Sequence, residues 1–128
     1  MKVEAAKLIL DIREAIGDRS KKFALEIIDL VERMPRNRAS DVVGRQLLRS
    51  GTSAGANYRE ANRGVARDDF VNKVGIATKE AAESEFWLEL ISESPHLQVP
   101  GTPALLQGSR EILAILTTIG KNAKMNRP

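Results

Sequence analysis

The sequence predicts an all-α protein, a single antiparallel up-down bundle of four helices. Apolar residues recur at steps of three and four along most of the chain, which is the period of an amphipathic helix. Aromatic residues make up only 4% of the 128 residues and β-branched runs are short, so strands have little support. Proline and glycine separate four long helical segments, and the length fits one domain.

The chain is predicted to begin with an N-terminal arm or short helix over residues 1–17, followed by the bundle domain over 18–128. Gly17 is expected to close that short helix. An extended arm is the alternative, because Leu8, Leu10 and Ile12 also alternate. The first bundle helix is predicted over residues 20–34, where Pro35 ends it. Its apolar face is Phe23, Ile27, Leu30, Val31 and Met34.

The second helix, predicted over residues 40–63, contains three glycines. Gly44, Gly51 and Gly55 each cost about 0.5–1 kcal/mol relative to alanine inside a helix. Together with the neighbouring serines and alanines they form a smooth surface. We expect this surface to allow an unusually close approach of another helix. The alternative is a helix that is frayed or broken at residues 50–56.

The third and fourth helices are predicted over residues 67–94 and from Pro103 onward, with Thr102 as the N-cap. Prolines and a glycine make residues 95–103 a break, and the single histidine, His96, is expected to lie in that loop. The third helix has a heptad seam typical of bundles. The seam consists of Phe70, Val74, Ala77, Ala81, Ser84, Leu88 and Ile91.

Five arginines of the second segment form a stripe. At roughly 100° per residue, Arg38, Arg45, Arg49, Arg59 and Arg63 share an arc of about 80°. Arginine pairs well with phosphates, so the stripe predicts contact with an RNA or DNA backbone through Arg38, Arg45, Arg59 and Arg63. Base stacking is not predicted, because no aromatic residues are interleaved. The alternatives are a solvated face, or pairing with residues 68–100, whose acidic excess equals the basic excess of residues 36–67. Arg49 is expected to be structural.

The third helix carries apolar residues opposite its seam as well. These residues are Ile76, Phe86, Trp87 and Leu90. A helix that is apolar on two sides has more surface to bury than one bundle offers, so we expect these four residues to form a subunit interface. The alternative is that the fourth helix or the N-terminal arm of the same chain covers them.

Catalysis and metal binding have little support in the sequence. Without cysteine and with one histidine, the chain lacks the ligands for a thiolate or di-iron site, and no cofactor or metal is expected. Polar residues of the second and third helices are instead expected to meet inside the bundle as a structural network that fixes helix register. That network comprises Arg49, Asn57, Glu60, Lys79, Glu80 and Glu83. The same cluster is the only candidate for acid–base chemistry.

Two motifs resemble a known family. The first is Arg49-Ser50-Gly51-Thr52-Ser53, with Gly55-Ala56-Asn57 and Glu60-Ala61; the second is Ile76 to Ala81 with Glu83 and Trp87 to Leu90. They resemble the four helix bundle protein family, also called 23S rRNA-intervening-sequence proteins, over roughly Ile12 to Ala123. The resemblance implies a left-handed bundle that assembles as a ring-shaped homopentamer in bacteria. Ala66 departs from the family, which often has serine there, so the third helix is expected to lack its N-cap.

The function expected from these observations is a non-enzymatic, oligomeric binding or assembly module with nucleic acid as a partner. The related accessory variability proteins of diversity-generating retroelements bind a reverse transcriptase and nucleic acid, so a protein partner is implied as well. A purely protein-binding scaffold and an enzyme that uses the polar cluster are the alternatives. No apolar run approaches the roughly 20 residues that span a bilayer and no signal peptide is evident, so a cytoplasmic protein without a membrane partner is expected.

Overall fold

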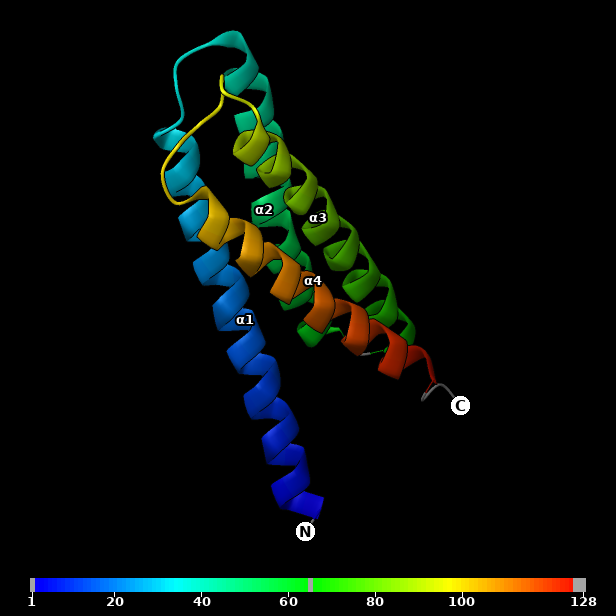
Figure 1. Ribbon diagram of the computed structural model, residues 1–128. Coiled ribbons are helices and arrows are strands. Elements are labelled where there is room, and N and C mark those ends of the chain that lie inside the picture. Colours follow the sequence, from blue (N-terminus) through cyan, green and yellow to red (C-terminus); the bar gives the residue numbers. More distant parts are fainter. Residues whose placement is uncertain (1, 65, 126–128) are drawn as a thin grey trace.

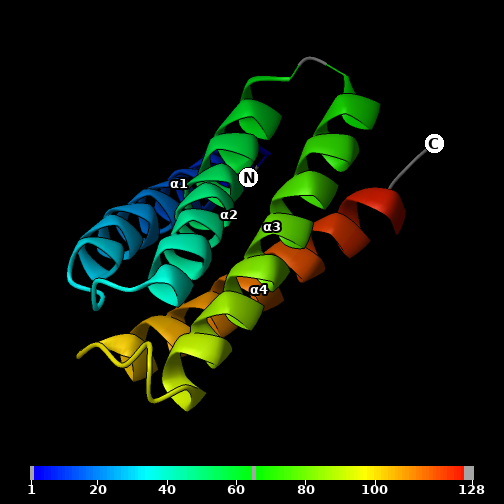
Figure 2. The same cartoon turned by 90° about the horizontal axis from the view of Figure 1, so that it is seen from above.

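A computed structural model describes residues 2–64 and 66–125 of the chain. Within these ranges the fold is an all-α bundle of four helices, as predicted: α1 (Lys2–Glu32), α2 (Arg38–Arg63), α3 (Arg67–Glu93) and α4 (Thr102–Met125). Successive helices run in opposite directions and lie side by side, and α1 also meets α4, so the four helices enclose one core (Figures 1 and 2). The α1–α4 contact is the smallest of the four, because these helices diverge toward the N-terminus of α1 (Figure 1).

The core lies where the predicted seams meet. Each helix contributes large side chains with almost no exposed surface, among them Ile27 from α1, Leu47 from α2, Leu88 from α3 and Leu116 from α4. The heptad seam of α3 is confirmed from Val74 to Ile91, and Phe70, at its start, is half-buried. Burying such side chains contributes about 1.5–3 kcal/mol each, so these seams hold the bundle together.

The glycines of α2 face α1, and the helix is continuous through residues 50–56. A Cβ atom added at Gly51 would lie 3.0 Å from both γ carbons of Ile27. One added at Gly55 would lie 3.3 Å from the backbone oxygen of Ser20, and one at Gly44 would lie 3.2 Å from Cγ1 of Val31. These distances are shorter than most contacts of a real Cβ atom, so a side chain here would push its neighbour on α1 by a few tenths of an ångström. The predicted close approach of another helix is therefore confirmed, and that helix is α1.

The predicted helix end at Gly17 is wrong, because α1 runs without interruption from Lys2 to Glu32. Nothing packs within 4 Å of the position that a Cβ atom would take at Gly17, so no neighbour forces a turn there. One glycine weakens an exposed helix by only about 1 kcal/mol relative to alanine, which the turns on either side tolerate. The first buried residue of α1 is Ser20, so the N-terminal part of the helix stands beyond the bundle (Figure 1).

The other helix ends follow the sequence signals within a few residues. Asn37 caps α2 by accepting a hydrogen bond from the backbone N–H of Ser40 at 2.8 Å. Ala66 precedes α3 without any side-chain cap, as expected. Thr102 is the first residue of α4 rather than its N-cap, and its hydroxyl donates to the carbonyl of Val99 at 2.8 Å. The predicted break between α3 and α4 is a loop, and its residue Leu97 is buried against the core. No helix in the described ranges has the length and apolar character needed to cross a bilayer.

Candidate nucleic-acid interface

All five arginines of the predicted stripe are exposed on the outer face of α2. The glycines on one flank of this helix face α1, and Ser50 on another flank is buried against Ser84 of α3. The remaining arc carries Arg38, Arg45, Arg49, Arg59 and Arg63, and it points to solvent. The packing of α2 therefore positions the stripe on an open surface of the protein.

Arg49 differs from the other four because it is bound to α3. Its Nη1 lies 2.9 Å from Oε2 of Glu80, and its Nη2 donates to Oε2 of Glu83. The indole N–H of Trp87 donates to the same oxygen of Glu83 at 3.0 Å. One arginine thus ties two helices together, which is the structural role expected for Arg49.

The four remaining arginines have no such partners. Within residues 2–64 and 66–125, no carboxylate forms an ion pair with Arg38, Arg45, Arg59 or Arg63, and none of these four side chains makes a hydrogen bond. Glu60, the nearest acidic residue in sequence, pairs instead with Lys73 of α3. The acidic third helix therefore neutralises Arg49 and leaves the rest of the stripe with its positive charge.

A shallow groove lies beside one end of the stripe, at Arg59 and Arg63. It has a volume of about 300 Å³ and runs between α1 and α2, with Gly17, Gly55 and Ala56 among the small residues that line it. Lys21, Arg59 and Arg63 line it together with one acidic residue, Glu60, so its basic side chains come from both helices and outnumber the acid. Small lining residues let a ligand approach the backbone closely, and the excess of cations favours an anion.

The predicted polar network is only partly present, and among its ion-paired members only Glu80 is largely buried. Arg49, Glu80 and Glu83 come together at the surface seam between α2 and α3. Asn57 donates to the backbone oxygen of Ser53 one turn earlier, at 2.9 Å, rather than to a group of α3.

The two remaining members of the predicted network point away from it. The side chain of Glu60 is 63% exposed, and Lys79 is exposed because it lies on the side of α3 opposite its seam. The prediction of one buried cluster is therefore wrong, and the geometry that acid–base chemistry would need at these residues is not formed. In the described part of the chain, no three carboxylate or imidazole groups are close enough to hold a metal ion.

The apolar residues predicted on the back of α3 are exposed to different degrees. Phe86 is 52% exposed, whereas Ile76, Trp87 and Leu90 are half-buried. Trp87 and Leu90 pack against the core of their own chain, and the rings of Phe86 and Trp87 meet edge to face with centroids 5.1 Å apart. The chain thus covers much of this surface itself and leaves mainly Phe86 in solvent.

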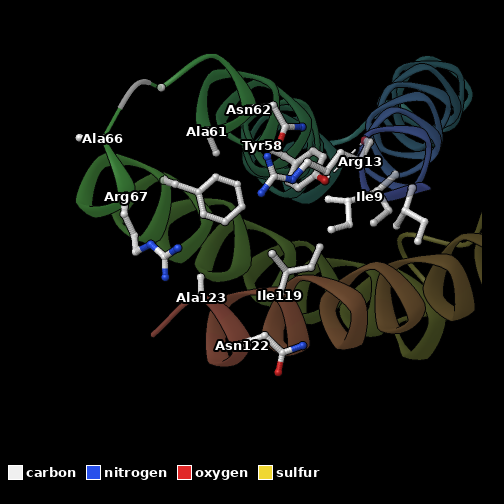
Figure 3. A pocket seen from close by; sticks show the side chains of 14 residues that line it. Ile9, Arg13, Tyr58, Ala61, Asn62, Ala66, Arg67, Ile119, Asn122 and Ala123 are labelled. Atoms are coloured by element: carbon white, nitrogen blue, oxygen red, sulfur yellow. Dashed lines mark hydrogen bonds between the residues drawn. The ribbon is translucent and has the colours of Figure 1, made fainter. Parts of the chain in front are cut away.

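A larger cavity at the open end of the bundle was not predicted. It has a volume of about 590 Å³, and we call it the end cavity (Figure 3). Its lining comes from all four helices and is apolar over Ile9, Ile12, Ile16, Phe70 and Ile119. The guanidinium of Arg13 lies 4.9 Å from the ring centroid of Phe70, and burial raises the pKa of the neighbouring Tyr58 hydroxyl. The sequence signal for this cavity is the helical spacing of Ile9, Ile12 and Ile16, which indicates one apolar face of α1. The sequence did not indicate which other helices that face meets.

Fold and surface together define a helical bundle with one basic face, and comparison with known proteins agrees with the fold. The profile of the 23S rRNA-intervening sequence protein family matches residues 14–118. The chain belongs to this family. It is similar to a solved structure from Bacteroides thetaiotaomicron, described as a protein with unknown function from the S23 ribosomal protein family. The two are 38% identical with a TM-score of 0.77, over 85% of this chain and 97% of the other. No curated protein matches the sequence.

Proposed function

We propose that this protein is a non-enzymatic, oligomeric binding module that contacts the backbone of RNA or DNA through Arg38, Arg45, Arg59 and Arg63. One observation carries the proposal: four of the five arginines on one exposed helix face have no carboxylate partner in the described chain, although an acidic helix packs beside them. Exposed arginines without partners are suited to bidentate contact with phosphate oxygens.

The dimensions of the stripe support a double-stranded ligand. At a rise of roughly 1.5 Å per residue, Arg38 and Arg63 are separated by about 38 Å along the axis of α2. One turn of a double helix is about 34 Å long, so the stripe can follow a duplex over one turn. The phosphate contacts are sequence-independent, which suits a surface that offers no aromatic side chains for stacking on bases.

The test is a charge-removal experiment with a matched control. In the variant Arg45→Ala/Arg59→Ala/Arg63→Ala, binding of a fluorescein-labelled 20-base-pair RNA or DNA duplex is measured by anisotropy over a range of salt concentrations. Each lost phosphate contact reduces the slope of log K against log salt by roughly 0.9, so we expect a slope lower by about 2–3 and weaker binding throughout. The control Lys22→Ala/Lys121→Ala/Lys124→Ala removes the same charge from exposed positions of α1 and α4.

Equal losses of affinity in both triple variants would show that only net charge matters. An unchanged salt slope in the arginine variant would show that the stripe is not the contact surface.

Duplex length gives a second readout. A duplex of about eight base pairs covers less than one turn, so it is expected to bind much more weakly than one of about 15 base pairs.

We also propose self-association, for which a homopentamer is the number implied by family resemblance. The exposed ring of Phe86 supports a contact on the back of α3, because large exposed apolar side chains favour interfaces. Phe86→Asp is the best probe of this contact. Trp87 is a poor probe, since its ring packs against the core of its own chain.

A further inference from the structure

The end cavity is a candidate site for a small molecule, separate from the basic stripe. Its volume of about 590 Å³ lies within the roughly 300–1,000 Å³ that is usual for ligand pockets. None of the four arginines proposed to contact nucleic acid lines it. All four helices contribute side chains to its wall, so its shape depends on the packing of the whole bundle (Figure 3).

The larger part of the wall is apolar. Ile9, Ile12 and Ile16 of α1 line it together with Phe70 of α3 and Ile119 of α4. Ile9 and Ile12 are 52% and 50% exposed, so the cavity is open to water on the side of α1. Isoleucine side chains make no directional contacts, and such a wall selects an apolar body by the area that is buried. An alkyl chain bends to follow an irregular wall of this kind and would cover the exposed isoleucines.

The polar part of the wall is positively charged. The guanidinium of Arg13 lies 4.9 Å from the ring centroid of Phe70, and Arg13 is half-buried. Within residues 2–64 and 66–125, no carboxylate forms an ion pair with Arg13. Arg67 also lines the cavity, and the described lining contains no aspartate or glutamate. A half-buried guanidinium attracts an anion more strongly than one in open water and suits the two oxygens of a carboxylate.

A buried hydrogen-bond acceptor without a donor lies near Arg13. Oδ1 of Asn62 has almost no accessible surface and accepts no hydrogen bond from the described residues. Burial raises the pKa of Tyr58, and a hydrogen bond from Asn62 and the charge of Arg13 oppose that rise, so these three side chains lie together (Figure 3). A buried acceptor that has lost water without gaining a donor is unfavourable. A ligand hydroxyl next to the carboxylate would supply that donor.

From these observations we infer that the end cavity binds a medium-chain hydroxycarboxylate. Its alkyl chain lies against the isoleucines, its carboxylate accepts hydrogen bonds from Arg13, and its hydroxyl donates to Oδ1 of Asn62. A sugar or a nucleotide would place polar groups against the isoleucines, which is costly. A hydrocarbon would leave both Arg13 and Asn62 without a partner. The inference depends neither on the proposed nucleic-acid contact nor on self-association.

The test is isothermal titration calorimetry of the full-length protein with 3-hydroxydecanoate. The wild type is expected to bind one molecule per chain. Arg13→Gln should weaken binding by about tenfold or more, because a charge-assisted hydrogen bond is lost. The control Lys22→Gln removes the same charge from an exposed position of α1 that does not line the cavity, and it should keep the wild-type affinity. Ala123→Trp places a large side chain in the cavity and should abolish binding.

A series of ligands tests the same inference on the unaltered protein. Decanoate lacks the hydroxyl and should bind about two- to tenfold more weakly than 3-hydroxydecanoate, and Asn62→Ala should remove that difference. Each CH₂ group taken from the chain should weaken binding by up to about fourfold. Tyr58 is the one tyrosine of the chain, so absorbance at 295 nm reports on the cavity. A carboxylate bound beside Tyr58 should raise its pKa further, whereas 1-decanol should not.

Several results would overturn the inference. These are no saturable binding up to about 1 mM ligand, equal affinities of Arg13→Gln and Lys22→Gln, and full binding by Ala123→Trp. Equal affinities of the wild type for decanoate and 3-hydroxydecanoate would overturn the contact with Asn62. If the affinity of the wild type falls as the protein concentration rises, a second copy of the chain occupies the cavity and the inference is wrong.

Discussion

The close contact between α1 and α2 makes a prediction that opposes ordinary helix propensity. Alanine favours an exposed helix interior by about 1 kcal/mol relative to glycine. At Gly51, however, the new Cβ atom would lie 3.0 Å from Cγ1 and Cγ2 of Ile27. Ile27 has no exposed surface, and its β-branched side chain has one strongly preferred rotamer in a helix, so it cannot turn aside. Overpacking of this kind costs about 1–3 kcal/mol.

Gly51→Ala is therefore expected to lower the free energy of unfolding by about 1 kcal/mol, as overpacking of about 2 kcal/mol outweighs the gain in propensity. Gly75→Ala is the matched control. Gly75 lies inside α3, is exposed, and would have nothing within 4 Å of its Cβ atom. The control should gain about 0.5–1 kcal/mol, so the two variants should differ by about 2 kcal/mol with opposite signs.

Urea unfolding followed by circular dichroism at a fixed protein concentration measures both changes, since any self-association makes stability depend on concentration. For a domain of this size the difference corresponds to roughly 8 °C in Tm. If both alanine variants stabilise the protein equally, α1 does not approach α2 at the distance described, and the explanation for the glycines of α2 is wrong.

Two further predictions concern buried hydroxyl groups. Burial raises the pKa of Tyr58, so the folded state keeps this proton more firmly than the unfolded state. Its contribution to stability is complete below the unfolded pKa of about 10 and is lost as the pH rises above it. The chain has one tyrosine, so absorbance at 295 nm reports its titration directly; a midpoint at or below the ordinary value would contradict this prediction. The hydroxyls of Ser50 and Ser84 lie 2.8 Å apart and fully buried. Ser84→Ala is expected to cost about 1–2 kcal/mol, and adding Ser50→Ala to cost little more, as a double-mutant cycle would measure; strictly additive losses would show that the two groups are not coupled.

The sequence predicted the helices well because each boundary has a local cause. Prolines mark the connections after α1 and between α3 and α4, and the seam of α3 is a repeat that only one face of a helix satisfies. The glycines of α2 were informative for the same reason, since three costly residues in one helix require a compensating contact. The stripe followed from angular spacing alone, and α2 is regular enough for that spacing to hold.

Predictions failed where the outcome depended on how helices are rotated and how far they extend. Sequence spacing placed Glu60 and Lys79 near Glu80 and Glu83, but the rotation of α2 and α3 turns both of them outward. Gly17 has the residue type of a helix end, yet continuing the helix costs less than ending it, and nothing in the sequence expresses that balance. The ring of Trp87, expected at an interface, is half-buried against the core of its own chain, and its place at an interface stays a prediction.

The continuity of α1 through Gly17 connects the packing of the bundle to the N-terminal end of this helix, residues 2–13. Because α1 is one helix, the contact of Ile27 and Ser20 with the glycines of α2 sets the direction of everything N-terminal to it. From Ser20 to Lys2 the helix extends about 27 Å at its usual rise, so a tilt of about 10° at the contact moves its tip by about 5 Å. A break at Gly17 would have uncoupled the two regions. The glycines of α2 that face α1 therefore fix the direction of residues 2–13 and of the cavity wall that α1 forms, although Gly44, Gly51 and Gly55 do not line the cavity.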